Sequence, residues 1–158
     1  MRWVVTPRAG LSLSGQFDTL CPMNTSLKDA YIIVVEDDPN AQLITLDLLR
    51  LGGATRCYAR KSVASALSYA ENLPQVDLFL VDINMPGQSG YDLLETVRAS
   101  EKFASAKVVA VTAGTLDADV NKARELGFDG FISKPLKMAE FVKQVERILK
   151  GEVVWDWR

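Results

Sequence analysis

The sequence predicts an α/β domain, in which a doubly wound parallel sheet carries helices on both faces. Short apolar runs alternate five times with segments of helical periodicity, which favours consecutive strand–helix units. Two of these runs, 31–35 and 78–81, are apolar almost throughout, as strands buried on both faces are. Polar side chains follow the predicted strands at their carboxyl ends, which is where open α/β sheets bind ligands.

The first half of the chain supplies three of the strands and two of the helices. "YIIVV" (31–35) is the first apolar run, and "PNAQLITLDLLRL" (39–51) has helical periodicity. Asp38 is a suitable cap for this helix and Pro39 a suitable first residue. "ATRCYA" (54–59) is a half-polar strand, "SVASALSYAENL" (62–73) is helical, and "VDLFLVD" (76–82) is apolar again.

The second half continues the alternation. "GYDLLETVRAS" (90–100) is helical, "AKVVAVTA" (106–113) is a strand, and "LDADVNKARELG" (116–127) is a helix that ends at a glycine. "DGFIS" (129–133) is a short strand, and "KMAEFVKQVERILKG" (137–151) is the last helix. We therefore expect one domain over 29–151. Residues 1–28 would be a poorly ordered N-terminal extension, and 152–158 a short C-terminal tail.

Composition excludes several classes of function. With 48% hydrophobic and 24% charged residues, the chain has the balance of a soluble globular protein. Its net charge of −2 gives no basic field for direct DNA binding. No apolar run approaches the roughly 20 residues that span a bilayer, so we expect a cytoplasmic protein without a membrane anchor. Histidine is absent, which leaves oxygen atoms as the main metal ligands.

Five polar side chains follow strands of the predicted sheet. Glu36 and Asp37 follow the first strand, Asp82 ends the third, Thr112 ends the fourth, and Lys134 follows the fifth. Because parallel strands end at one edge of a sheet, we expect these side chains to meet there. Carboxylates this close repel one another unless a positive charge lies among them.

The chemistry of this edge suits a hard cation and a phosphoryl group. Mg²⁺ prefers carboxylates together with water and phosphate oxygens, and it would offset the repulsion among Glu36, Asp37 and Asp82. Aspartate is an established nucleophile that forms an aspartyl-phosphate. Lys134 could pair with one phosphoryl oxygen, and the hydroxyl of Thr112 could donate a hydrogen bond to another.

At four strand ends the sequence resembles the receiver domain of two-component response regulators. The matching segments are "VVEDDPN", "LFLVDINMPGQSGYDLL", "VVAVTA" and "FISKPL". Thr112 follows Asp82 by 30 residues, and Lys134 follows Thr112 by 22, both as in that family. The resemblance covers about residues 30–150. It implies a flavodoxin-like (βα)₅ fold with the strand order 2-1-3-4-5.

The resemblance also implies a role for each matching residue. Asp82 would be the phosphoacceptor, and Mg²⁺, or Mn²⁺ in its place, would bind at the acidic edge. The implied metal ligands are Glu36, Asp37, Asp82 and the backbone carbonyl of Asn84. Thr112 and Phe131 would form the switch, with Phe131 swinging inward, although Phe131 suits core filling equally well. Lys134 would contact the phosphoryl group, and the peptide bond before Pro135 would be cis.

A receiver of this kind implies particular partners. A histidine kinase or a histidine phosphotransfer protein would supply the phosphoryl group, and slow autodephosphorylation would remove it. The chain would be a signalling phosphoacceptor and not an enzyme with a separate substrate. A downstream protein would read the family's usual output face, here about 116–149.

Two further features concern partner contacts. In the first helix, one side is predicted to face inward: Ala41, Ile44, Thr45, Leu48 and Leu49. Leu43 and Leu46 fall on the other side, where they are either ordinary exposed leucines or a docking site for the phosphodonor. In the tail, Trp155 and Trp157 either pack back on the domain, which we favour, or mark a contact with a partner.

Two alternatives stay open at this stage. The chain could be the receiver module of a hybrid histidine kinase, which has the same site. It could also be a phosphohydrolase of the haloacid-dehalogenase type, which uses an aspartate nucleophile and Mg²⁺. That family has a second aspartate two positions after the first, and this chain has Asn84 there.

Overall fold

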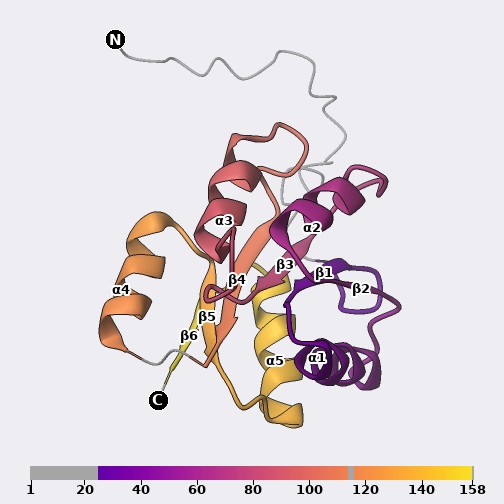
Figure 1. The fold of residues 1–158 in the computed structure, drawn as a ribbon. Helices are drawn as coiled ribbons and strands as arrows, with labels where there is room; N and C mark the ends of the chain where they lie inside the picture. The colour runs from indigo at the N-terminus through magenta and orange to yellow at the C-terminus, as the bar shows by residue number, and fades with distance from the viewer. Residues whose placement is uncertain (1–24, 114–115, 158) are drawn as a thin grey trace, which may run out of the picture.

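Six parallel strands form one sheet in the order β2-β1-β3-β4-β5-β6 (Figure 1). The computed structural model of the chain describes residues 25–113 and 116–157. The strands are β1 (Tyr31–Val35), β2 (Arg56–Arg60), β3 (Leu78–Val81), β4 (Lys107–Thr112), β5 (Gly130–Ser133) and β6 (Val154–Asp156). The helices are α1 (Pro39–Leu51), α2 (Val63–Ala70), α3 (Gly90–Ala99), α4 (Asp117–Leu126) and α5 (Met138–Leu149).

The doubly wound architecture confirms the predicted fold class. The order of the first five strands is 2-1-3-4-5, as expected, and every predicted element is present. Predicted and observed ends differ by three residues or fewer. Asp38 caps α1 by accepting hydrogen bonds from the N–H groups of Asn40 and Ala41, and Gly127 ends α4 with a positive φ of 97°.

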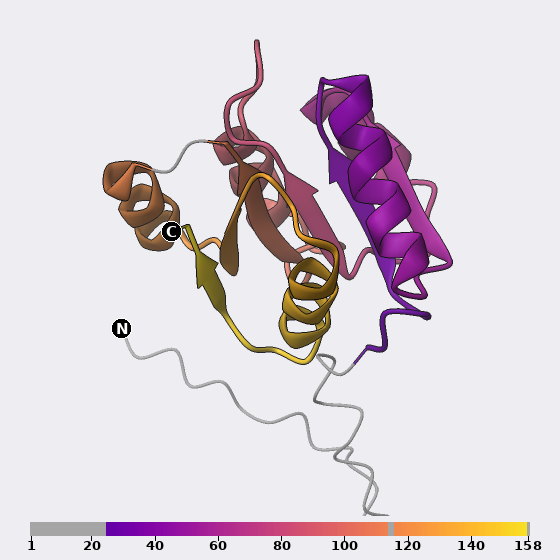
Figure 2. The same ribbon diagram turned by 90° about the horizontal axis from the view of Figure 1, so that it is seen from below.

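Helices cover both faces of the sheet, and each face has its own core (Figures 1 and 2). Ile33, Phe79 and Phe131 point to the side of α2, α3 and α4. Their neighbours along the strands point to the side of α1 and α5, where Phe141 is also buried. The strands β3 and β4 are buried along nearly their whole length, so the near-continuous apolar runs of the sequence have a direct physical cause.

The sixth strand corrects the five-stranded prediction. Residues 154–156 of the expected tail pair with β5, and they extend the sheet by one strand. Gly151 makes the required turn after α5 with a φ of 90°. Trp155 and Trp157 are half-buried and pack against the core on the side of α2, α3 and α4, which confirms that they pack on the domain.

Residues 25–28 of the predicted N-terminal extension belong to the folded domain. Leu27 is buried in the core beneath α1 and α5, and the hydroxyl of Thr55 donates a hydrogen bond of 2.8 Å to the carbonyl of Lys28. The expectation that the extension is poorly ordered otherwise falls on residues 1–24, which lie outside the described residues.

Candidate functional site at the carboxyl edge of the sheet

Backbone hydrogen bonds hold the strand ends in register at the carboxyl edge. The N–H of Asp82 donates to the carbonyl of Val35 at 3.0 Å, and the N–H of Lys134 donates to the carbonyl of Thr112 at 2.9 Å. The strand ladders therefore continue to the site residues themselves. This continuity is why side chains far apart in the sequence have defined positions relative to one another.

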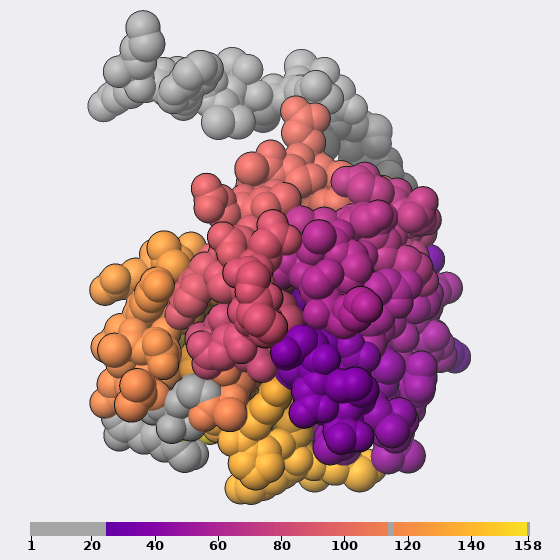
Figure 3. Space-filling model, in the orientation of Figure 1, coloured from indigo at the N-terminus to yellow at the C-terminus, as the bar shows by residue number. Residues whose placement is uncertain are grey.

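Three carboxylates meet at this edge, as predicted. Glu36, Asp37 and Asp82 each place a carboxylate oxygen within 4.8 Å of the others. Glu36 is buried, Asp82 is half-buried and Asp37 is exposed, so the cluster opens to solvent on the side of Asp37. In Figure 3 the indigo residues that follow β1 lie against the rose residues that follow β3.

Lys134 brings a positive charge into the cluster. Its Nζ donates a hydrogen bond to Oε2 of Glu36 and lies 3.4 Å from Oδ2 of Asp82. Burial raises the pKa of Glu36 above its usual value, although the hydrogen bond from Lys134 opposes this shift. Burial alone would lower the pKa of Lys134, but its bonds to the two carboxylates outweigh that effect and raise the pKa.

Asn84 connects Asp82 to Thr112. Its backbone N–H donates to Oδ1 of Asp82 at 2.9 Å, and its side-chain amide donates to Oγ1 of Thr112 at 3.1 Å. Thr112 is only 1% exposed. Sequence reasoning assigned Asn84 a backbone role alone and missed this side-chain bond, because nothing in the local sequence indicates which strand end the amide reaches.

The other expected members of the site lie on and after β5. The Lys134–Pro135 peptide bond is cis, as expected. Phe131 is fully buried, and it pairs with Trp155 across β5 and β6. Phe131 is therefore already inside the core in this conformation, and its expected role in a switch stays a prediction.

The outer side of α1 differs from the prediction. Leu43 is exposed as expected, but Leu46 is half-buried and packs against the core, whereas Ile44, expected inside, is 54% exposed. The buried line of α1 is centred on Thr45 and Leu49, so Ile44 lies further from it than Leu46 does. Ile44 instead lines an apolar hollow of about 420 Å³ beside Lys134.

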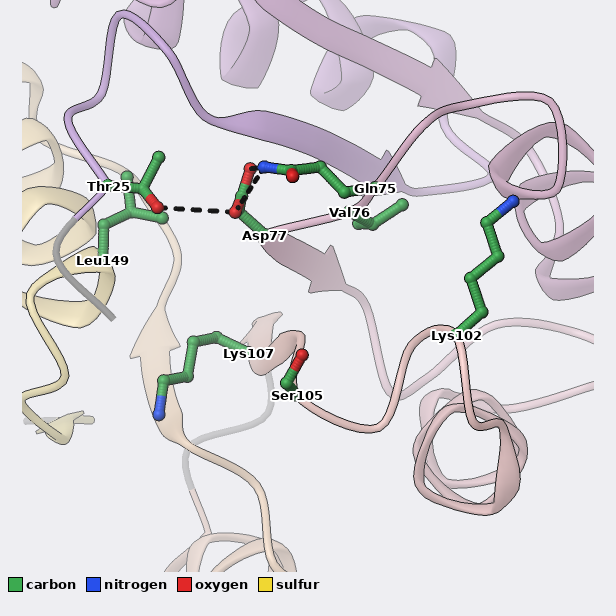
Figure 4. Close-up of a pocket in the computed structure, with 8 residues that line it drawn as sticks. All are labelled: Thr25, Gln75, Val76, Asp77, Lys102, Ser105, Lys107 and Leu149. Carbon is green, nitrogen blue, oxygen red and sulfur yellow. Dashed lines mark hydrogen bonds between the residues drawn. The ribbon is translucent and has the colours of Figure 1, made fainter. Parts of the chain in front are cut away.

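A second hollow of about 310 Å³ lies at the opposite edge of the sheet (Figure 4). There Asp77 accepts hydrogen bonds from Gln75 and from Thr25. The ammonium groups of Lys102 and Lys107 extend away from Asp77, and they interact with Glu71 and Asp129 respectively. The polar groups do not converge on a common point, so this hollow is not a candidate site.

The donor set at the carboxyl edge fits a magnesium ion. All of its candidate ligand atoms are oxygens, and Mg²⁺ takes carboxylate and carbonyl oxygens in preference to nitrogen or sulfur. Glu36 and Asp82 share one ammonium group for their two charges, while Asp37 adds a third negative charge beside them. The excess negative charge favours the binding of a divalent cation at this edge.

Within residues 25–113 and 116–157, no helix has the length and apolar character needed to cross a lipid bilayer.

Two curated proteins are similar to this chain over three quarters of its length. RprY, a transcriptional regulatory protein of Bacteroides fragilis, is 29% identical over 119 residues, which are 75% of this chain and 49% of RprY. The chain therefore spans about half the length of that relative. The chemotaxis protein CheY of Pseudomonas aeruginosa is 30% identical over 119 residues, which are 75% of this chain and 95% of CheY.

A solved structure supports the fold. The chemotaxis protein CheY4 of Vibrio cholerae superposes with a TM-score of 0.70 at 20% identity, over 75% of this chain and 98% of that one. Residues 32–146 match the family described as response regulator receiver domain. Since this match covers well over half of the chain, and the matching strand ends meet at one edge, the chain belongs to the receiver domain family of two-component signalling.

Proposed function

We propose that this receiver accepts a phosphoryl group on Asp82 from a histidine kinase or a histidine phosphotransfer protein. One observation supports the proposal above all: Lys134 reaches across the sheet to within 3.4 Å of the Asp82 carboxylate, beside Asp37 and Glu36. A carboxylate nucleophile, two further acidic ligands and a positive charge are the parts that phosphoryl transfer to aspartate requires.

The side chains of this chain would divide the reaction as follows. A carboxylate oxygen of Asp82 attacks phosphorus, and the bond from phosphorus to the donor nitrogen breaks with its electron pair going to that nitrogen. Lys134 pairs with a phosphoryl oxygen, and the Thr112 hydroxyl donates to another. In autodephosphorylation, water attacks phosphorus and loses a proton to solvent, the bond from phosphorus to the Asp82 oxygen breaks, and inorganic phosphate leaves as the Asp82 carboxylate is restored.

A magnesium ion would be held by Glu36, Asp37, Asp82 and the backbone carbonyl of Asn84. When bound, it supplies positive charge that stabilises the phosphoryl oxygens as negative charge develops on them. Mn²⁺ has the same preference for oxygen ligands and would take its place.

Helix α1 offers a docking surface for the phosphodonor. Leu43 and Ile44 are both more than half exposed, and Ile44 lines the apolar hollow beside Lys134 and Pro135. An amphipathic helix of the donor could lay its apolar side there while its histidine reaches Asp82. Leu46, proposed with Leu43 on sequence grounds, would contribute less because it packs against the core.

Labelling with acetyl phosphate tests the proposed acceptor. We expect one phosphoryl group per chain by mass spectrometry in MgCl₂, none in EDTA, and none in Asp82→Asn. Asp38→Asn is the matched control, because Asp38 is exposed and asparagine also caps helices, so its label should equal wild type. Equal labelling of Asp82→Asn would refute the assignment. Repeated turnover of p-nitrophenyl phosphate would favour a phosphohydrolase instead.

A further inference from the structure

The chain covers the edge of β5 with its own C-terminal segment. β6 pairs in parallel with β5, with Val154 opposite Gly130 and Trp155 opposite Phe131. Figures 1 and 2 show β6 as the outermost strand, beside β5. The strand therefore occupies an edge that a five-stranded sheet would leave open, within the expected output face at about 116–149.

Side chains of β6 and of the residue after it hold α4. The guanidinium carbon of Arg124 lies 4.7 Å from the ring centre of Trp155 and 5.7 Å from that of Trp157. The indole N–H of Trp157 donates a 3.0 Å hydrogen bond to Asp117, the first residue of α4. Both ends of α4 are thus connected to the C-terminal segment by cation–π contacts or a hydrogen bond.

The same segment also contacts α5. The side-chain amide of Gln144 donates to Asp156 at 2.7 Å, and Arg147 pairs with Glu152 at 2.7 Å. Val154 is buried in the core beneath α5. Residues 152–157 therefore bridge α4, β5 and α5, which are the three elements of the expected output face.

β5 has the local geometry that this pairing needs. A Cβ at Gly130 would lie 2.7 Å from the carbonyl oxygen of Val154, closer than van der Waals contact allows. Only glycine leaves room for β6 at this distance, so pairing is favoured by a residue inside the domain as well as by the segment itself.

Residues 152–157 also adjoin the expected switch. Phe131 is fully buried between its β4 neighbour, Ala110, and its β6 neighbour, Trp155. Within α4, whose residues are all described, only Val120 and Ala123 are buried, so the contacts with the two tryptophans add to a small buried surface in holding this helix. Any displacement of Phe131 would therefore change the packing beside Trp155.

We propose that residues 152–157 are an autoinhibitory latch, docked on α4, β5 and α5 before phosphorylation and released after it. The proposal rests on the proposed function, because phosphorylation of Asp82 is the event that would release the latch. Docking of the latch and phosphorylation of Asp82 then favour different conformations of the domain. By linkage the effect is reciprocal, so weakening the docked latch should favour the phosphorylated conformation.

Tryptophan fluorescence tests the forward direction. In the full chain with Trp3→Phe, Trp155 and Trp157 are the only tryptophans, and their quenching by acrylamide reports their exposure. Phosphorylation with acetyl phosphate should raise the quenching constant about twofold, with the label counted on the same samples. A full label with unchanged quenching overturns the latch alone. An absence of label overturns the proposed function, and the latch with it.

Beryllium fluoride, an equilibrium stand-in for the phosphoryl group, tests the reverse direction by calorimetric titration in MgCl₂. Trp155→Ala and Arg124→Gln should each bind it about fivefold more tightly than wild type. Arg124 is exposed, so its substitution leaves the core intact even if Trp155→Ala does not fold. The matched control is Val153→Ala, an exposed position in the same segment, which should bind as wild type. Unchanged affinity in Arg124→Gln would overturn the proposal.

Discussion

Lys134 connects the stability of the domain with its proposed chemistry. Its ammonium group contacts the buried carboxylate of Glu36 and the half-buried one of Asp82. Without it, two negative charges would lie side by side in a partly desolvated place. In the proposed function, the same position would let Lys134 meet a phosphoryl group on Asp82, so that the residue would change partners without changing its location.

Replacing Lys134 with Met should lower the free energy of unfolding by about 2 kcal/mol at pH 7, because Glu36 loses its partner while it stays buried. The pKa of Glu36, already raised by burial, should rise further once the opposing bond is lost. A carboxyl whose pKa is raised in the native state binds more protons there than in the unfolded chain, so protonation stabilises the native state. The loss of unfolding free energy in Lys134→Met, relative to wild type, should therefore shrink as the pH falls from 7 to 5.

Urea denaturation in EDTA at both pH values measures this effect. Lys137→Met is the matched control, because Lys137 pairs with Glu140 in an exposed ion pair that contributes little. If the loss of unfolding free energy in Lys134→Met stays constant or grows as the pH falls, Glu36 is not the group that the substitution leaves unpaired.

At the scale of elements, the side chains of α1 that stabilise the domain are different from those proposed to dock a partner. Leu49 is fully buried, Leu46 is half-buried and Leu43 is 56% exposed. Burial depends on distance from the line where the helix meets the sheet and α5, which the periodicity of the sequence alone locates only approximately. The exposed side carries apolar residues that the fold itself does not need.

Alanine substitutions along α1 should follow this burial in their effect on the free energy of unfolding. Leu49→Ala should cost about 3 kcal/mol, and Leu43→Ala less than about 0.5 kcal/mol. Leu46→Ala should fall between them. Chemical denaturation of the three variants under one condition gives the ranking, and a loss for Leu43 equal to that of Leu49 would contradict the position of α1.

At the scale of the whole molecule, the part of the site that follows strand order could be predicted from sequence. Asp82 and Lys134 are 52 residues apart, yet parallel strands of known order must bring their ends together. β6 could not be predicted in this way. Three residues do not form a strand alone, and the pairing depends on Gly130, whose role appears only when Val154 lies against it.

The acidic edge also connects metal binding to the stability of the whole domain. If Mg²⁺ binds the native cluster and not the unfolded chain, as proposed, it should raise the free energy of unfolding by about 2.7 kcal/mol at 100 times its dissociation constant. In the absence of Mg²⁺, the Asp37→Asn variant should melt at a higher temperature than wild type, since the substitution removes one of three mutually repelling carboxylates.

Adding MgCl₂ should then stabilise wild type and leave Asp37→Asn nearly unchanged, so that the order of the two melting temperatures reverses. Differential scanning calorimetry at constant ionic strength, with NaCl replacing MgCl₂, separates binding from screening. Asp38→Asn should keep the wild-type response, because Asp38 caps α1 and lies outside the cluster. An equal Mg²⁺ shift in Asp37→Asn would mean that the stabilising ion binds elsewhere. A lower melting temperature for this variant without Mg²⁺ would mean that repulsion at this edge is already relieved by Lys134.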